Sequence, residues 1–232
     1  MPRLATSDHY TLDLPAGHRF PIAKYALIRE QLLWQGIAAP EDFYEPGLCA
    51  EEDVLRVHTP AYWHRVRDLQ LTAREVRNLG LPQSPQLVRR SLSSSAGTLQ
   101  SALHALRDGI GLNLAGGTHH AFADRGEGFC VLNDQAIAAA HLLAHGLAQQ
   151  VLIVDLDVHQ GDGTAAIFRN EPRVFTFSMH AGPIIRSAKS SRTWIFRWTW
   201  APATRRTWRS CALPWPRWWP RCGPILSFTR PG

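Results

Sequence analysis

The chain has 232 residues, 45% of them hydrophobic, and a formal net charge of +6. This length fits one α/β domain with a sizeable core. No run approaches the roughly 20 apolar residues that cross a bilayer, and the first 17 residues lack the apolar core of a signal peptide. The four cysteines have no paired spacing, so we expect a cytoplasmic protein with reduced thiols: Cys49, Cys130, Cys211 and Cys222.

Three helices are predicted between the strands. Residues 23–35 have apolar side chains at helical spacing and stop at Gly36. A long helix is expected over residues 84–108, with Leu99, Leu103 and Leu106 on one face. Asn133 or Asp134 can cap a third helix that runs to residue 145. These patterns predict an amphipathic helical layer.

Isolated histidines are interpreted as surface residues. His141 and His145 are four apart on the third helix and could hold a metal ion, but the sequence shows no third donor nearby. We therefore favour surface histidines on an amphipathic helix, and we expect the same of His58, His64 and His104.

Buried strands are predicted where short apolar runs meet chemically active residues. Residues 110–114 read as one strand, which runs into a glycine turn and the pair His119-His120. Residues 151–154 read as a second strand, followed by Asp155, Asp157, His159 and Asp162, and residues 174–179 read as a third. Parallel α/β sheets place ligands at the carboxyl ends of their strands. Asp157 and His159 leave an extended segment on the same side, which suits half of a zinc site.

These motifs resemble the zinc-dependent histone deacetylase family, particularly its bacterial and class IV members. The resemblance rests on Gly116 to Ala121, Gly128 to Asp134 and Asp155 to Thr164, with weaker matches at His18 to Tyr25 and Val57 to Tyr62. It covers roughly residues 8–182 in the family's order. It implies the α/β fold of the arginases and deacetylases, in which helices cover both faces of a parallel sheet. The carboxy-terminal part of that fold is expected to be missing or scrambled in this chain.

The resemblance also implies roles for individual residues. Asp157 and His159 match two of three protein zinc ligands. His119 and His120 match the pair that flanks the zinc-bound water, with His120 as the proton shuttle. Two aspartates would orient these histidines: Asp155 for His119 and Asp162 for His120.

The same resemblance implies a substrate tunnel and a second cation. Gly128 and Phe129 would wall a narrow tunnel for acetyl-lysine. Backbone carbonyls of five residues would form a structural site for a monovalent cation, K⁺: Asp155, Asp157, His159, Ser178 and Met179. The implied reaction is hydrolysis of the acetyl amide of a lysine in a protein or of a small acetylated amine, by metal-activated water.

The chain changes character after Gly182. Residues 1–182 have a net charge of −4, whereas residues 183–232 contain ten Lys and Arg, no acid, seven Trp and seven Pro. No helical or alternating period continues among these prolines. We therefore divide the chain into a partial deacetylase catalytic domain, residues 1–182, and a basic tail, residues 183–232, that is not natively folded.

A change of reading frame would explain the tail. Residues 193–204 permit a DNA sequence whose neighbouring frame reads Asp-Leu-Asp-Ile-Pro-Leu-Asp-Leu-Gly-Thr-Gly-Asp, which resembles the continuation of the family sequence. Residues 227–232 permit Leu-Tyr-Gln-Ala-Gly in that frame, which resembles the strand leading to the third zinc ligand. The third zinc ligand of the family is an aspartate, and it has no match in this chain. The family's tyrosine that stabilises the oxyanion has no match either. The sequence therefore predicts impaired activity.

Three other functions are open from the sequence. The chain could be a non-catalytic pseudoenzyme, or the basic tail could bind nucleic acid through Arg and Trp. The three aspartates Asp155, Asp157 and Asp162 would also suit a manganese hydrolase of the arginase type. The His119-His120 pair and the Gly128-Phe129-Cys130 segment favour the deacetylases over these, and we expect neither a membrane nor a nucleic-acid partner.

Overall fold

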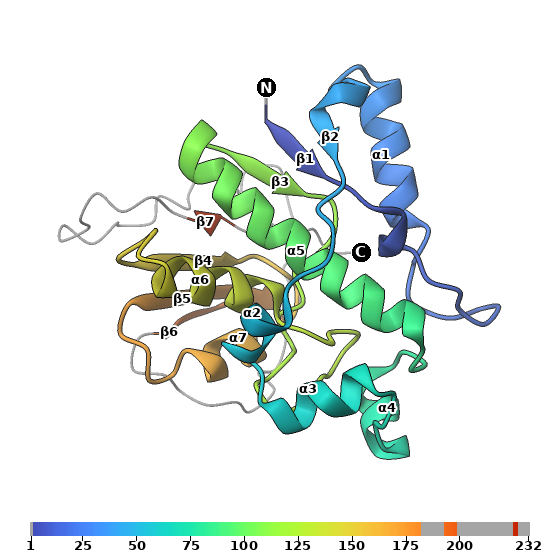
Figure 1. The fold of residues 1–232 in the computed structure, drawn as a ribbon, viewed down its shortest axis with the longest axis vertical. Helices are drawn as coiled ribbons and strands as arrows, with labels where there is room; N and C mark the ends of the chain where they lie inside the picture. The colour runs from blue at the N-terminus through green and yellow to red at the C-terminus, as the bar shows by residue number, and fades with distance from the viewer. Residues whose placement is uncertain (1, 182–192, 199–224, 227–232) are drawn as a thin grey trace.

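The computed structural model describes residues 2–181, 193–198 and 225–226, with side chains described for residues 2–181. Its strands form two parallel sheets (Figure 1). One has the order β2-β1-β3 and the other β6-β5-β4-β7. The strands are β1 (Arg3–Ala5), β2 (Phe43–Tyr44), β3 (Gly111–Asn113), β4 (Val151–Asp155), β5 (Val174–Ala181), β6 (Thr193–Trp198) and β7 (Ile225–Leu226). The predicted α/β class with parallel strands is confirmed.

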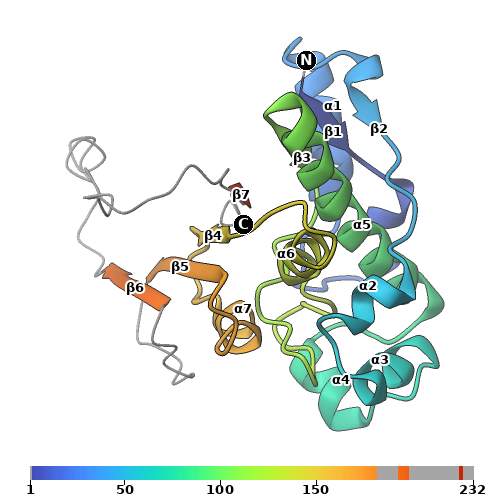
Figure 2. The ribbon, with the colours of Figure 1, turned by 60° about the vertical axis from the view of Figure 1, so that its left-hand side comes forward.

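Helices connect and cover these strands. They are α1 (Lys24–Trp34), α2 (Glu51–Leu55), α3 (Pro60–Arg67), α4 (Ala73–Leu79), α5 (Pro85–Asp108), α6 (Asp134–Ala144) and α7 (Asp162–Ile167), with short 3₁₀ turns at η1 (Asp8–Tyr10) and η2 (Pro40–Asp42). The long helix α5 contacts β1, β3 and α6. Figure 2 shows α6 end-on, between β4 on one side and α5 and α2 on the other. None of the helices within the described residues is long and apolar enough to span a membrane.

The predicted helix boundaries are confirmed because local capping fixes them. Ser84 caps α5 by accepting a hydrogen bond from the amide of Leu87, and Gly109 ends this helix in the left-handed conformation. Asn133 caps α6 in the same way, through the amide of Ala136. Side-chain oxygens satisfy amides that the first helical turn leaves free, so these helix starts are readable from sequence.

One predicted helix face is only partly buried, and one prediction of a buried strand is wrong. Leu106 on α5 is 52% exposed, and only Leu99 and Leu103 of the predicted face pack against the core. Residues 110–114 contain the predicted strand, but Ile110 and Leu112 are exposed by 51% and 39%. The strand pairs with β1 on one side. Periodicity predicts which side chains share a face, but the neighbours that cover that face are set by the tertiary fold.

The core lies between α3, α5, α6 and the start of β4. It contains the buried side chains Tyr62, Leu132, Ile137 and Ile153, among others. The strand β4 pairs with β5 in parallel from Val151↔Val174 to Asp155↔Ser178. Its apolar residues therefore anchor Asp155 at the carboxyl end of the strand, which fixes one end of the candidate site.

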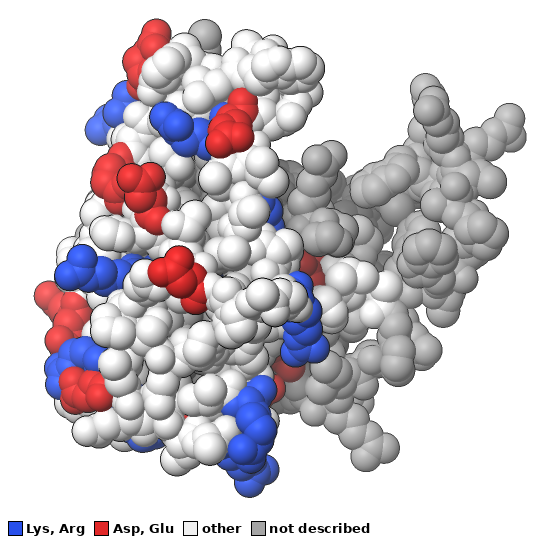
Figure 3. Space-filling view, turned by 90° about the vertical axis from the view of Figure 1, so that its right-hand side faces the viewer, with Lys and Arg blue, Asp and Glu red and all other residues white. Residues whose placement is uncertain are grey.

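The predicted tail falls mostly outside the described residues. Two short strands from it are described: β6 pairs with β5, and β7 pairs with β4. The prediction that residues 183–232 form an out-of-frame tail stays a prediction. On the face shown in Figure 3, the positively charged Lys and Arg side chains of the described residues are interspersed with the negatively charged Asp and Glu side chains.

Candidate active site

Two histidine–aspartate pairs lie side by side at the end of β4. His119 Nδ1 is 2.5 Å from Asp155 Oδ2, and His120 Nδ1 is 2.8 Å from Asp162 Oδ1. The two imidazole rings are 4.1 Å apart between centroids. An ionised carboxylate can only accept, so each Nδ1 carries a hydrogen and donates it. In the neutral rings both Nε2 atoms therefore have the lone pair.

The local backbone explains how these pairs form. Asp155 is the last residue of β4, and Asp162 is the first residue of α7. A Cβ on Gly163 would lie 2.6 Å from the carbonyl oxygen of His119 and 2.5 Å from that of Ala121. Only glycine lets α7 begin against the histidine segment, so the glycines of this turn are a packing requirement.

Burial and charge act in opposite directions on His119. The residue is 4% exposed, and burial by itself lowers the pKa of an imidazole. The hydrogen bond that His119 donates to Asp155, with the charges of Asp155, Asp157 and Asp162, outweighs burial and raises the pKa of His119 above its usual value. The pair His119–Asp155 thus favours a charged imidazole at the base of the site.

The predicted metal ligands lie next to these pairs. Asp157 Oδ1 accepts from the His159 amide at 2.7 Å and lies 3.0 Å from His159 Nδ1. Asp157 Oδ1 is also 3.8 Å from His119 Nε2, and the His159 ring is 5.8 Å from the His120 ring. Residues 157–159 form a bend, so the predicted extended conformation is wrong, although the side chains of Asp157 and His159 do lie together. Within the described ranges, no group of three or more His, Cys, Asp or Glu is arranged to hold a metal ion.

Of the two residues predicted to wall a tunnel, Gly128 lies against His120. A Cβ on Gly128, whose φ is +54°, would lie 2.9 Å from the His120 ring. Phe129 follows with φ +67°, and its ring is 5.0 Å from that of Phe20. The guanidinium of Arg19 lies 4.9 Å over the Phe129 ring. Phe129 thus packs against Phe20 and Arg19, and it follows in sequence the glycine that lies against His120.

The residues predicted for a monovalent cation come from β4, β5 and the turn after β4. Asp155 and Ser178 are register partners in the parallel pair, and Met179 follows Ser178. The Ser178 hydroxyl accepts from the Gly161 amide at 3.2 Å, which ties β5 to the turn. Asp157 and His159 belong to that same turn. These five residues are therefore neighbours in the fold.

Asp134 is a residue of the site that sequence reasoning assigned only to helix capping. Its side chain is buried and accepts hydrogen bonds from the amides of Gly117 and Thr118 at 3.1 and 2.8 Å. It also accepts from the Thr98 hydroxyl at 2.5 Å. The carboxylate therefore holds the glycine turn that leads into His119. Its place at the start of α6, within the Gly128 to Asp134 motif, was the available signal.

The Asp134 contacts extend into a buried network. Thr98 accepts from the Asn113 side-chain amide at 2.9 Å, and Tyr10 donates to the Asn113 amide oxygen at 2.8 Å. This chain of hydrogen bonds joins η1, β3 and α5 to the turn before His119. Networks of this kind fix one conformation when every member is satisfied.

His58 is a correction to the sequence prediction. It is 1% exposed and not a surface residue. Its Nε2 accepts from the backbone amide of Asn133 at 3.0 Å, and the Asn133 side chain donates to the Ala121 carbonyl and to Thr164, each at 3.0 Å. His58 thus supports the residue that links the histidine segment to α7.

The buried His58 predicts a loss of stability in acid. Burial lowers the pKa of His58 to about 4, against smaller opposing effects of the Phe122 and Ala123 backbone. Between pH 6.5 and 4 the unfolded chain binds a proton that the folded chain does not, so stability falls as pH falls through this window. The free energy of unfolding should drop by about 3 kcal/mol from this group across the window. Urea unfolding at pH 7 and pH 5 measures it.

The matched variants separate His58 from other titrating groups. His58→Gln keeps an acceptor for the Asn133 amide but does not titrate. The free energy of unfolding of this variant should therefore fall by about 2 kcal/mol less between pH 7 and pH 5 than that of the unchanged chain. The exposed His64, changed to Gln, should leave the pH dependence as it is. An identical pH dependence in the chain and in His58→Gln would show that His58 is not the group responsible.

The chain is similar to proteins of one known family. The model of the histone deacetylase domain matches residues 18–185. An uncharacterised protein of Picosynechococcus sp. is 48% identical over 171 residues, which is 74% of this chain and 57% of that protein. The acetoin utilization protein AcuC of Staphylococcus aureus is 30% identical over 173 residues, which is 70% of this chain and 44% of that protein. The chain thus spans about half the length of these curated relatives.

Solved structures show the same fold. A histone deacetylase homologue complexed with SAHA superposes with a TM-score of 0.68 at 26% identity, over 78% of this chain and 51% of that one. A histone deacetylase homologue from Aquifex aeolicus superposes with a TM-score of 0.72 at 22% identity, over 85% and 59%. The domain match covers more than half of the chain, with the His119 and His120 pairs, Asp157 and His159 inside it. The chain belongs to the histone deacetylase family.

Proposed function

We propose that this fold hydrolyses the acetyl amide of acetyl-lysine, or of a related acetylated amine, with a bound zinc ion. The observation that carries the proposal is the juxtaposition of two Nδ1-anchored histidines with an Asp–His donor pair. In each histidine–aspartate pair, Nδ1 is bound to the carboxylate and Nε2 is left for proton transfer. The Asp157 carboxylate of the donor pair lies 3.8 Å from Nε2 of His119. Metal-assisted amide hydrolysis uses an ion to activate water and a proton donor for the leaving amine.

Asp157 and His159 would hold the zinc ion. Carboxylate oxygen and imidazole nitrogen are zinc donors, and here they lie 3.0 Å apart in one turn, close enough to share one ion. Zinc, when bound, polarises the acetyl carbonyl and lowers the pKa of a bound water. The neighbouring backbone carbonyls near Asp155 and Ser178 would hold a structural K⁺ ion.

His120 would protonate the leaving amine. Its Nδ1 is held by Asp162, which leaves Nε2 directed away from that carboxylate for exchange of the proton. His119, paired with Asp155, would hold the attacking water by a hydrogen bond. Gly128 and Phe129 beside His120 would guide an extended acyl-amine side chain to these nitrogens.

Two buried free thiols support a reducing compartment. Cys49 and Cys130 are buried and free, and burial raises the pKa of each thiol to about 12. Neutral buried thiols of this kind are stable in a reducing cytoplasm. We therefore propose a cytoplasmic location.

We also propose that the 232-residue chain is a slow catalyst or a non-catalytic relative of the active enzymes. The described residues supply two zinc donors where catalytic zinc normally has three. The domain match stops at residue 185, close to the change in composition after Gly182. Reading the DNA across codons 178 to 240 in all three frames tests the cause: a neighbouring frame with the family strings supports a frame change, and its absence rules this out.

Removal of metal tests the proposed reaction. The full chain, incubated at high concentration with an acetyl-lysine peptide, should release free lysine side chains slowly. A chelator should abolish this release and added Zn²⁺ should restore it, because the activator is lost and then replaced. Mass spectrometry of the peptide measures the product. Release that persists unchanged in the chelator would rule out the metal-dependent reaction, and no release at any zinc concentration would support the non-catalytic alternative.

A further inference from the structure

We propose that His141 and His145 form a surface site for a divalent transition-metal ion, with Asp53 as the group that orients His141. The site lies at the carboxyl end of α6, where His141 is in the last turn and His145 is the C-cap residue. The two residues are four apart on a helix, so they lie one turn apart on the same face. Their rings are stacked with centroids 4.1 Å apart and an interplanar angle of 28°.

Hydrogen bonds preset both imidazoles for metal binding. His141 Nδ1 is 2.7 Å from Asp53 Oδ1, and His145 Nδ1 is 2.9 Å from the backbone carbonyl of His141. Carboxylate and carbonyl oxygens accept, so both Nδ1 atoms carry the hydrogen in the neutral rings. The lone pair of each ring is therefore on Nε2. Metal-binding histidines are held in this way, by a carboxylate or carbonyl behind the ring.

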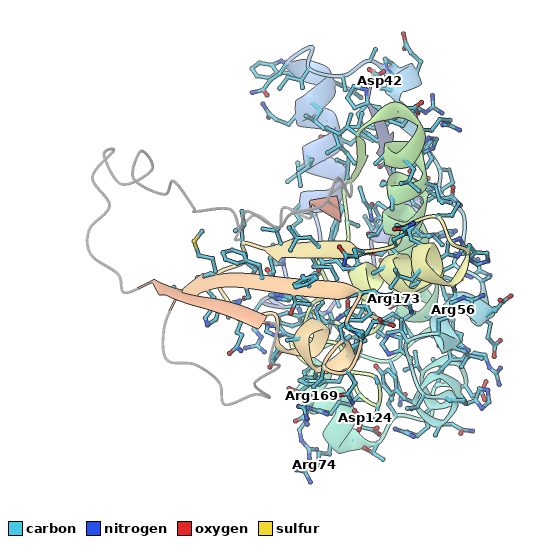
Figure 4. All side chains as sticks on the ribbon, turned by 90° about the vertical axis from the view of Figure 1, so that its left-hand side faces the viewer. Asp42, Arg56, Arg74, Asp124, Arg169 and Arg173 are labelled. Carbon is cyan, nitrogen blue, oxygen red and sulfur yellow. The ribbon has the colours of Figure 1, made fainter. Side chains whose placement is uncertain are left out.

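Both Nε2 atoms are available. Neither has a hydrogen-bond partner within the described part of the chain, and His145 is exposed while His141 is half-buried. Asp53 is itself 9% exposed and accepts from Arg56 Nε at 3.2 Å, which holds its carboxylate in place. Figure 4 labels Arg56, on the α2 side of the molecule. Two imidazoles with bound waters completing the coordination suit Cu²⁺, Ni²⁺ or Zn²⁺.

The site is separate from the proposed catalytic zinc. Asp134 begins α6 and contacts the turn before His119, whereas His141 and His145 lie seven and eleven residues further along. At 1.5 Å per helical residue this is roughly 10 to 16 Å. A metal ion at the pair would bind the folded helix only, and it would therefore stabilise the packing of α6 with α2.

Copper binding tests the site independently of deacetylation. The probe is Cu²⁺ alone, because copper binds nitrogen sites most tightly among these ions. The protein is the full chain with Asp157→Asn and His159→Gln, so that the candidate catalytic donors do not contribute. Electron paramagnetic resonance at pH 7.5 should show one bound Cu²⁺ with two imidazole nitrogens. The same sample should melt at a higher temperature with copper than without it.

Single variants in this background identify the ligands. His141→Gln and His145→Gln should each weaken copper binding by more than about 10-fold, since even the loss of a group behind a ligand costs roughly 10- to 100-fold. Asp53→Asn should weaken it by roughly 10-fold. His64→Gln, at an exposed histidine on α3, is the matched control and should not change it.

The outcomes decide the proposal. Equal copper affinity in His145→Gln and His64→Gln, or a spectrum with a single imidazole, would overturn the site. An unchanged affinity in Asp53→Asn would overturn the orienting role of Asp53 alone. Circular dichroism of each variant shows that the helix is intact. None of these readouts depends on whether the chain deacetylates.

Discussion

Replacing His120 with alanine is expected to lower the deacetylation rate of the chain by about 10²- to 10⁴-fold, the usual contribution of a general acid or base. The His120 ring has an anchoring carboxylate at 2.8 Å, and Gly128 lies close against the ring. Alanine removes the proton donor for the leaving amine but keeps the Asp157–His159 pair. The rate of the chemical step should therefore fall more than substrate binding does.

A reactive substrate makes this loss measurable in a slow chain. A trifluoroacetyl-lysine peptide has a more electrophilic carbonyl, so single-turnover release can be followed by fluorine NMR. His64→Gln serves as the control for histidine loss at the surface, and its rate should equal that of the unchanged chain. If His120→Ala and the unchanged chain have the same measurable rate, His120 is not the proton donor. In that case His119 becomes the residue to test.

Asp134→Ala is expected to lower the free energy of unfolding by about 4 kcal/mol. The carboxylate is 1% exposed and accepts from two backbone amides and the Thr98 hydroxyl. Each hydrogen bond to a charged group contributes roughly 1.5–3 kcal/mol, and its removal leaves buried donors without a partner. The loss should be less than the sum because the turn can relax. Urea unfolding at pH 7 measures the change.

The surface residue Asp124 gives the matched control. It is labelled in Figure 4, and its side chain is 66% exposed beside Arg125. Asp124→Ala should change stability by no more than about 0.5 kcal/mol. The free energy of unfolding of Asp134→Asn should lie between those of Asp134→Ala and Asp124→Ala. The asparagine amide offers one oxygen acceptor but adds donors that face the Gly117 and Thr118 amides. Equal stability of the Asp134 and Asp124 variants would show that Asp134 does not hold the histidine turn.

The sequence by itself determined the elements that carry the site. Helix boundaries at Ser84, Gly109 and Asn133 follow from capping within a few residues, and β4 follows from its apolar run. The spacing of His119 and His120, and of Asp155, Asp157 and His159, fixes these groups on two short segments. Such features depend on contacts close in sequence, and the family motifs contain them. The α/β class was therefore predictable, and so was the placement of these candidate residues on two short segments.

The tertiary structure alone decided how distant residues meet. His58 receives the Asn133 amide from 75 residues away, and Asp53 reaches His141 across 88 residues. No local pattern marks such pairs, because a histidine or aspartate on a helix looks the same whether solvent or another helix faces it. The exposure of Leu106 and Ile110 has the same origin, since burial depends on which neighbours cover a face. Periodicity therefore predicts which face of a helix or strand is apolar, whereas tertiary packing determines which neighbouring element covers that face.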